Sequence, residues 1–303
     1  MIQPQYLKSG DKVGIVSPAG HISSEIVEKA AKVIESRGYE VVRGEHLKCK
    51  HHQFAGSDRD RREDLQQMLD SQDIKAIICS RGGYGMIRLI KNLDFIAFRE
   101  NPKWVVGFSD ITVLHAHLNN NLNIASIHGP MLKMLAEQPE SESTNMLFDI
   151  LKGERTAIKL NRKFKSGRAL IEGKLTGGNL SIICSLIGTD YDFDPVGKIL
   201  FLEDIGEHHY KIDRMFHQLL FSNKLTGLKA IILGQFSEMK DDEEYFGEGI
   251  AEMLRNKLEG QGTLIISDFP CGHEDINLPL ILNSIYQISL GKEQMFFLGQ
   301  KQD

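Results

Sequence analysis

The chain has 303 residues, of which 41% are hydrophobic and 25% are charged, and its formal net charge is -5 at pH 7. This composition is typical of a globular protein with one large domain or two modest ones. The small negative charge gives no reason to expect a nucleic-acid partner, and no apolar run approaches the roughly 18 residues that a membrane span needs.

The start of the chain and its cysteines indicate a cytoplasmic protein. Residues 1–8 lack a basic region followed by an apolar core, so we expect no signal peptide. The four cysteines are far apart, and no two have the spacing of metal ligands. In a chain of this size without an export signal, we expect them to be free thiols in a reducing compartment.

Strands and helices alternate over the first half of the chain. Buried strands are predicted at 12–16, 39–42, 76–80, 104–106 and 123–127, and helices at about 24–36, 62–69, 86–90 and 111–118. The connections are short, and this alternation favours a parallel sheet covered by helices on both faces.

The pattern loosens between about 135 and 166, and a domain boundary is predicted there. The predicted parts are an N-terminal α/β domain over 1–150, a linker over 151–168 and a smaller C-terminal domain of mixed α/β type over 169–303. In the second domain, strands are predicted at 169–175, 198–202, 230–234, 263–266, 280–282 and 284–290, and helices at 177–186, 213–220 and 249–258.

The stretch Gly107-Phe108-Ser109-Asp110 lies between a predicted strand and a predicted helix and is too short for a relaxed loop. A serine on such a sharp turn is pushed out of the sheet, with the first amides of the helix beside its hydroxyl. That is the geometry of a nucleophile elbow, whose backbone donors can hold the charge that develops on a carbonyl oxygen. The usual elbow has glycine where Ile111 stands, so on this stretch alone the simpler interpretation of the serine as a helix N-cap is favoured.

A serine nucleophile needs a base to take its proton and a third group to orient that base. His115 and His117 follow the serine on the same predicted helix, too far along its axis to turn back to the hydroxyl. His273 stands in the loop 268–275 after a predicted strand, and loops at strand ends often carry catalytic groups. Glu203 directly follows a predicted strand, so it either turns to solvent or stands at a cleft.

The glycine-rich loop Arg81-Gly82-Gly83-Tyr84-Gly85 matches neither a Walker A motif nor a dinucleotide fingerprint. Its backbone N–H groups could form an anion-binding nest, or the loop could simply be a tight strand-to-helix turn. The chain has no His-Glu-x-x-His and no Cys-x-x-Cys, and no cluster of carboxylates in it argues for a metal, so we expect neither a metal nor another cofactor.

Taken together, these segments resemble one family over nearly the whole chain, the LD-carboxypeptidases. These are serine peptidases that include murein tetrapeptide carboxypeptidase and the microcin C self-immunity hydrolase. The pieces that carry the resemblance are, in chain order, Ser17-Pro18-Ala19, Ser80-Arg81-Gly82-Gly83-Tyr84-Gly85, Gly107-Phe108-Ser109-Asp110-Ile111-Thr112, His128-Gly129-Pro130, Gly177-Gly178-Asn179-Leu180, Leu202-Glu203-Asp204-Ile205-Gly206-Glu207, Ile212-Asp213-Arg214 and Gly272-His273. Each piece alone is weak, but eight of them in this order make a specific match.

The resemblance implies a Ser-His-Glu triad, which falls on Ser109, His273 and Glu203. It implies an oxyanion hole formed by the backbone N–H groups of Gly83 and Asp110. It also implies a two-domain α/β fold with the nucleophile on the first domain, its partners on the second and the active site in the cleft between them. A homodimer is the oligomeric state that the family suggests.

Arg81 and Asn179 are candidates for substrate contacts. An exopeptidase must bind the free carboxylate of the departing residue, and an arginine fork does that well, although a structural ion pair is an equal alternative for Arg81. The family usually has Pro-Tyr after Gly206-Glu207, whereas this chain has His208-His209. That pair is interpreted as solvated loop residues, and it leaves the specificity of the substrate-side loop open.

The sequence therefore predicts a cytoplasmic serine carboxypeptidase that releases the terminal D-alanine from murein tetrapeptides through an acyl-enzyme. Its partner is a small-molecule substrate, a murein peptide or a peptidyl-nucleotide, with no nucleic acid and no membrane. The first alternative is a microcin-immunity hydrolase that cleaves a peptidyl- or aminoacyl-nucleotide, with Tyr84, Tyr210 and the pair Tyr245-Phe246 as the aromatic residues that could stack on a base. The second alternative is a non-catalytic ligand-binding module, and the diamino acid of the murein peptide, lysine or diaminopimelate, stays open.

Overall fold

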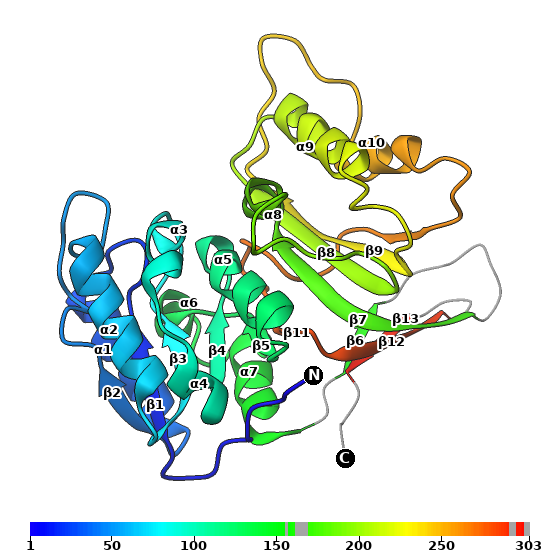
Figure 1. Ribbon diagram of the computed structural model, residues 1–303. Coiled ribbons are helices and arrows are strands. Elements are labelled where there is room, and N and C mark those ends of the chain that lie inside the picture. The colour runs from blue at the N-terminus through cyan, green and yellow to red at the C-terminus, as the bar shows by residue number, and fades with distance from the viewer. Residues whose placement is uncertain (155–156, 161–168, 291–294, 300–303) are drawn as a thin grey trace. The chain divides into compact units, whose positions relative to one another are not determined.

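The computed structural model describes residues 1–154, 157–160, 169–290 and 295–299, which form two compact units (Figure 1). Unit 1 is Met1–Glu154 with Leu278–Leu280, and unit 2 is Arg155–Asn277 with Ile281–Asp303. The division falls inside the predicted linker 151–168, of which 155–156 and 161–168 lie outside the described residues. The described part of that linker includes a strand, β6, and the short segment Leu278–Leu280 belongs to unit 1 although it was predicted in the C-terminal domain.

Unit 1 is built on a six-stranded sheet with the order β11-β5-β4-β3-β1-β2. Its strands are β1 (Lys12–Val16), β2 (Glu40–Arg43), β3 (Ile74–Cys79), β4 (Trp104–Gly107) and β5 (Ser126–His128), together with β11 (Leu280–Leu282), of which only Leu280 belongs to unit 1. Strands β1 to β5 pair in parallel with their neighbours. The prediction of a parallel sheet in the first domain is confirmed.

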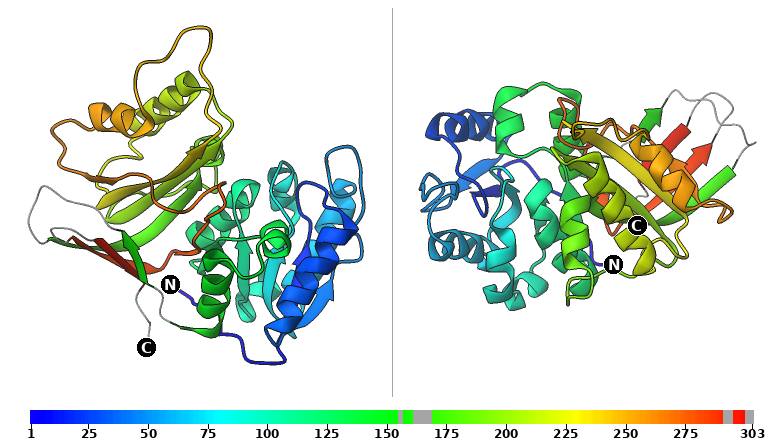
Figure 2. Two further views of the ribbon diagram at one scale, coloured as in Figure 1. Left: turned by 180° about the vertical axis from the view of Figure 1, so that it is seen from behind. Right: turned by 90° about the horizontal axis from the view of Figure 1, so that it is seen from above.

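Helices cover both faces of this sheet. They are α1 (Ser24–Ser36), α2 (Asp58–Asp70), α3 (Met86–Leu89), α4 (Ile96–Glu100), α5 (Thr112–Ala116), α6 (Leu132–Glu137) and α7 (Glu142–Lys152). Helix α1 packs against α6 on one face, and α2 packs against α3 and α4 on the other (Figures 1 and 2). Both faces of the sheet are therefore withdrawn from water, which explains why the inner strands β1, β3 and β4 are mostly apolar rather than alternating.

The loops that follow β1 and β3 lie where the direction of the chain through the sheet reverses. The chain passes from β1 to β2 on one side, and from β3 to β4 on the other. Such a switch point, at the carboxyl ends of the strands, is where open α/β sheets commonly bind ligands. The two loops are joined here because the Gly20 backbone N–H donates to the Gly82 carbonyl oxygen over 3.1 Å.

Unit 2 is a seven-stranded mixed sheet with the order β10-β9-β8-β7-β12-β13-β6. Its strands are β6 (Ala157–Leu160), β7 (Ala169–Asn179), β8 (Lys198–Ile205), β9 (Ala230–Ser237), β10 (Leu264–Ile266), β12 (Ile285–Leu290) and β13 (Met295–Gly299). Strands β7 to β10 are parallel, whereas β12, β13 and β6 are antiparallel to their neighbours. The predicted mixed α/β second domain is confirmed.

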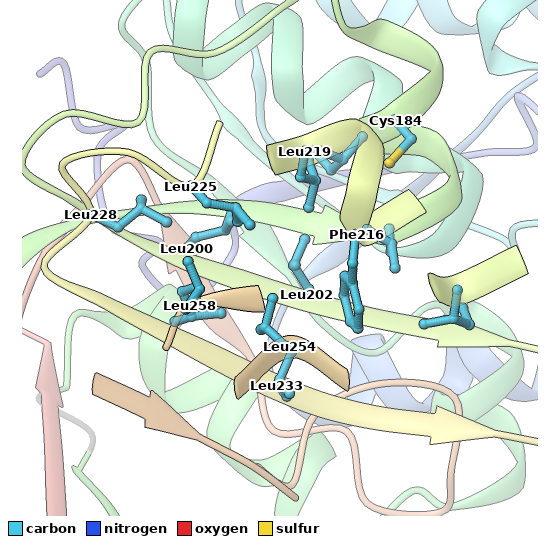
Figure 3. Packing of buried hydrophobic residues seen from close by; sticks show 14 of the residues in the cluster. Cys184, Leu200, Leu202, Phe216, Leu219, Leu225, Leu228, Leu233, Leu254 and Leu258 are labelled. Carbon is cyan, nitrogen blue, oxygen red and sulfur yellow. The ribbon is translucent and has the colours of Figure 1, made fainter. Parts of the chain in front are cut away.

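Three helices cover the parallel half of the second sheet: α8 (Leu180–Leu186), α9 (His209–Phe221) and α10 (Ile250–Lys257) (Figure 1). Their apolar side chains meet those of β8 and β9 in a buried cluster, shown in Figure 3. Phe216 and Leu219 of α9 and Leu254 of α10 face Leu202 of β8 and Leu233 of β9 there. This cluster fixes the parallel strands whose ends carry the site.

Candidate active site

Ser109 lies on a sharp turn between β4 and a helical turn at Ser109–Ile111. Its backbone φ is 62°, in the left-handed region that non-glycine residues rarely adopt. The N-cap of the turn is Phe108, so the interpretation of Ser109 as a helix cap is wrong. A strained serine on a strand-to-helix turn is the nucleophile-elbow geometry, even though Ile111 replaces the usual glycine.

The glycine-rich loop comes into direct contact with this serine. A Cβ placed on Gly82 would lie 2.7 Å from the Cβ of Ser109, 2.9 Å from its Oγ and 3.5 Å from the Asp110 backbone nitrogen. Only glycine allows the loop to come so close. The next residue, Gly83, has φ +113° and is exposed, so the backbone N–H groups of Gly83 and Asp110 belong to two segments that meet at the serine.

Glu203 and His273, both in unit 2, form a close pair. The Nδ1 atom of His273 lies 2.6 Å from the Oε2 atom of Glu203, whose side chain is fully buried. Burial raises the pKa of the Glu203 carboxyl group, and the hydrogen bond with His273 opposes that effect. With Nδ1 bonded to the carboxylate, Nε2 is the ring nitrogen that can accept a proton, which is the arrangement a histidine base requires.

The register of the sheet changes at Glu203. On β8 and β9, Leu202 is opposite Leu233, whereas Asp204 is opposite Phe236, so β9 carries an extra residue beside Glu203. Such a bulge bends a strand and re-aims its side chains, and bulges are frequent next to active sites.

Two side-chain amides hold the loop that carries His273. Gln235 accepts the Glu274 backbone N–H over 3.2 Å and donates to the Ile276 carbonyl oxygen over 3.0 Å. Asn277 accepts the Gly272 backbone N–H over 3.1 Å. Sequence reasoning missed both amides, although a polar residue directly after the predicted strand 230–234 was a signal for Gln235.

Asn179 has its polar atoms engaged by the fold. Its side chain is 5% exposed, its Oδ1 caps α8 by accepting the Ile182 backbone N–H over 3.2 Å, and its Nδ2 donates to Asp204 over 3.0 Å. It also lies opposite Glu203 in the sheet and lowers the pKa of that carboxyl group. These contacts describe a residue that positions the Glu203 strand, while the predicted substrate contact stays a prediction.

Arg81 is exposed at the start of the glycine-rich loop. Its guanidinium donates over 3.4 Å to the His21 carbonyl oxygen. Among the residues that the structure describes, Arg81 has no ion pair, so the alternative of a structural ion pair finds no support there.

Three histidines that lie near the family motifs, His115, His208 and His209, contact the backbone or a carboxylate of the fold. Nε2 of buried His115 contacts the Gly107 carbonyl oxygen over 2.8 Å, and burial lowers the pKa of His115 to about 4. The predicted solvated pair is partly withdrawn from water instead: His208 precedes α9 as its N-cap residue and lies against Asp242, and His209 lies against Asp241, with nitrogen–oxygen distances of 3.1 and 2.8 Å.

No group of three or more His, Cys, Asp or Glu side chains in the described ranges could hold a metal ion. Within those ranges, no helix is both long and apolar enough to cross a bilayer.

Comparison with known proteins decides the family. Residues 13–129 match the model of the LD-carboxypeptidase N-terminal domain, and residues 172–288 match that of the LD-carboxypeptidase C-terminal domain. The chain belongs to the LD-carboxypeptidases. Its two matched domains correspond to units 1 and 2, and its family membership makes it a serine-type carboxypeptidase.

Relatives of similar length support the same assignment. The chain is 32% identical over 288 residues to the probable murein peptide carboxypeptidase of Bacillus subtilis, covering 89% of this chain and 86% of the relative. The crystal structure of muramoyltetrapeptide carboxypeptidase from Oxalobacter formigenes is 29% identical, with a TM-score of 0.86 and coverage of 96% and 100%. MccF in complex with glutamyl sulfamoyl guanosine has a TM-score of 0.87 over 100% of this chain and 99% of its own, but at 21% identity it shows the shared fold alone.

Proposed function

We propose that this protein releases the terminal D-alanine from murein tetrapeptides, with Ser109 as nucleophile, His273 as base and Glu203 as the group that orients the base. The observation that carries the proposal is the buried Glu203–His273 pair, whose oxygen and nitrogen are 2.6 Å apart. A buried carboxylate bonded to a histidine ring is costly to maintain and is well suited to stabilise an imidazolium ion during catalysis.

In this mechanism Ser109 Oγ attacks the carbonyl carbon of the scissile bond while its proton moves to Nε2 of His273. The backbone N–H groups of Gly83 and Asp110 hold the charge on the carbonyl oxygen. The C–N bond then breaks, the imidazolium gives its proton to the leaving amine of D-alanine, and an acyl-enzyme remains. Water, activated by His273, hydrolyses the ester and regenerates the serine.

Arg81 is proposed to bind the carboxylate of the departing residue. Its guanidinium is exposed and has no ion pair within the described part of the chain, and the forked donors of arginine suit a free carboxylate. Replacing Arg81→Gln should raise KM for the tetrapeptide about tenfold or more while changing kcat less, because the contact forms already in the bound ground state. An unchanged KM would remove Arg81 from the substrate site.

The experiment that tests the function is release of free D-alanine from tetrapeptides that contain either lysine or diaminopimelate. Ser109→Ala should abolish release, whereas Ser36→Ala, which changes an exposed serine of α1, should leave it unchanged. No release from either peptide by the unaltered protein would overturn the murein proposal.

The second candidate is hydrolysis of an aminoacyl-nucleotide conjugate. One observation favours it: Tyr84 directly follows Gly83, and 47% of its surface is exposed, so its ring is available to stack on a base. An aminoacyl-sulfamoyl adenosine offered beside the tetrapeptide distinguishes the two. If the nucleotide conjugate is the substrate, Tyr84→Ala should slow its cleavage and leave cleavage of the peptide unchanged.

The proposal includes a cytoplasmic location, which rests on the scattered cysteines, and a homodimer, which rests on the family resemblance. Cell fractionation and sedimentation velocity at several concentrations test the two statements directly. Recovery outside the cytoplasm, or sedimentation as a monomer at every concentration, would contradict them.

A further inference from the structure

The carboxylate of Asp110 is buried beside the proposed oxyanion hole, and the mechanism above does not use it. The residue is 1% exposed, and its Oδ2 atom accepts the backbone N–H of Met86 over 2.7 Å. The Gly85 backbone N–H also stabilises the charged form of this carboxyl group. Asp110 therefore binds the far end of the glycine-rich loop through its side chain, while its own backbone N–H lies beside Ser109.

Burying a carboxylate at this contact costs free energy. Burial raises the pKa of the Asp110 carboxyl group to about 6, and Oδ1 is buried without a hydrogen-bond partner in the described structure. A neutral side chain could accept backbone N–H groups at lower cost. An anion accepts stronger and shorter hydrogen bonds from backbone donors than a neutral oxygen does. The negative charge of Asp110 therefore makes the glycine-rich loop more rigid.

Arg61 packs against the same loop. Its side chain is 1% exposed, and its Nη1 atom donates to the Pro18 carbonyl oxygen over 2.5 Å. A Cβ on Gly85, which has φ +149°, would lie only 2.3 Å from that nitrogen, so the guanidinium packs directly on the loop backbone. Its positive charge also lowers the pKa of Asp110.

The loop is thus fixed on both sides of Gly83. The Gly82 carbonyl accepts the Gly20 backbone N–H, and Gly85 and Met86 are held by Asp110. We infer that Asp110 is a positioning residue: its carboxylate anchors the loop that supplies one oxyanion donor, Gly83, to the residue whose backbone supplies the other. This inference rests on the proposed function, because it takes those two N–H groups as the oxyanion hole.

Two substitutions at this position test the inference. Asp110→Asn keeps the size of the side chain and one acceptor oxygen but removes the charge, whereas Asp110→Ala removes the anchor. We expect kcat to fall about tenfold in Asp110→Asn and about 100-fold in Asp110→Ala, with KM unchanged within about twofold. A displaced oxyanion donor stabilises the transition state less but leaves the binding of the substrate unchanged.

The matched control is Asp64→Asn in the same unit. Asp64 is also buried and also accepts a backbone N–H, from His46 over 2.9 Å, but it lies outside the glycine-rich loop. It should leave kcat unchanged. A kcat for Asp110→Ala equal to that of the unaltered protein, or a loss matched by the Asp64 variant, would overturn the inference.

Amide hydrogen exchange separates this inference from the proposed function. Exchange at Gly83 to Met86 should accelerate at least about tenfold in Asp110→Ala and less in Asp110→Asn, with the amides of the β4 strand unchanged. An inactive unaltered protein with this exchange pattern would refute the proposed function but keep the anchor. Unchanged exchange at these amides in an otherwise active protein would refute the anchor alone.

Discussion

The two halves of the proposed triad are held in place by different physical means. In unit 1, Ser109 is fixed by its backbone, through a left-handed φ and the close approach of Gly82. In unit 2, His273 is fixed by side chains, namely the carboxylate of Glu203 and the amides of Gln235 and Asn277.

The difference predicts two kinds of sensitivity. Where the backbone itself holds a catalytic group, an atom added to a neighbouring residue must displace the chain, so a single small substitution should have a large effect. A group held by several hydrogen bonds loses them one at a time, so each single truncation removes part of the support. The following predictions are ordered by the size of the expected effect.

Replacing Glu203→Gln should lower kcat about 10⁴-fold, since glutamine keeps the shape of the side chain but stabilises neither the required tautomer of His273 nor its imidazolium form. Steady-state release of D-alanine measures the effect, with circular dichroism as the check on folding. A loss of less than about tenfold would show that the buried pair does not serve the reaction.

Replacing Gly82→Ala should lower kcat/KM about 100-fold or more, because the new Cβ would lie 2.7 Å from the Cβ of Ser109 and must displace the nucleophile or the loop. Gly249→Ala is the control, since nothing lies within 4 Å of a Cβ at Gly249. If both variants had equal activity, the backbone of unit 1 would not hold the serine as described.

The free energy of unfolding should depend on pH through the buried carboxyl group of Asp110 in unit 1. The pKa of Asp110 is raised from 3.8 to about 6 in the folded protein, so its stabilising contribution is full below about pH 3.8 and is lost as the pH rises through about 6. The unfolding free energy of Asp110→Asn, relative to that of the unaltered protein, should therefore increase by about 2 kcal/mol between pH 4 and pH 7. Urea titrations across this range measure it, and a constant difference would contradict the raised pKa.

Replacing Gln235→Ala should lower kcat only about tenfold, because the His273 loop loses two of its hydrogen bonds but keeps those to Glu203 and Asn277. The double variant with Asn277→Ala should lose more than the sum of the two single effects in free energy if both amides hold one loop. Strict additivity would indicate that the two amides act independently.

The regular elements of the fold could be predicted because their sequence patterns are strong. Helix α1 begins after Ser23, whose Oγ accepts the Ile26 backbone N–H, and buries its residues at helical spacing. Helix α2 begins at Asp58 rather than at Arg62, since the capping box of Ser57 and Asp60 starts it within a charged turn that carries no apolar period. Helix α7 was missed although Ser141 caps its start, Gly153 ends it and its buried residues recur at helical spacing. Strand β13 was missed as well.

The site could be predicted only where the family resemblance assigns a role to a residue. Ser109, Glu203 and His273 lie at or just after the ends of predicted strands, but their roles as a triad followed only from the resemblance to the LD-carboxypeptidases. Gln235 and Asp110 have roles that depend on which backbone groups the fold brings to their side chains. No spacing in the sequence records that Asp110 reaches Met86, 24 positions earlier in the chain.

The most direct test of the account is labelling with a serine-reactive fluorophosphonate, followed by peptide mass spectrometry. The account predicts that Ser109 is the labelled residue, and that His273→Ala and Glu203→Gln slow its labelling about 100-fold or more, because the serine loses its base. Labelling of Ser109 at the same rate in the His273 variant would show that the residues of the two units do not act together, and labelling of another serine would remove Ser109 as the nucleophile.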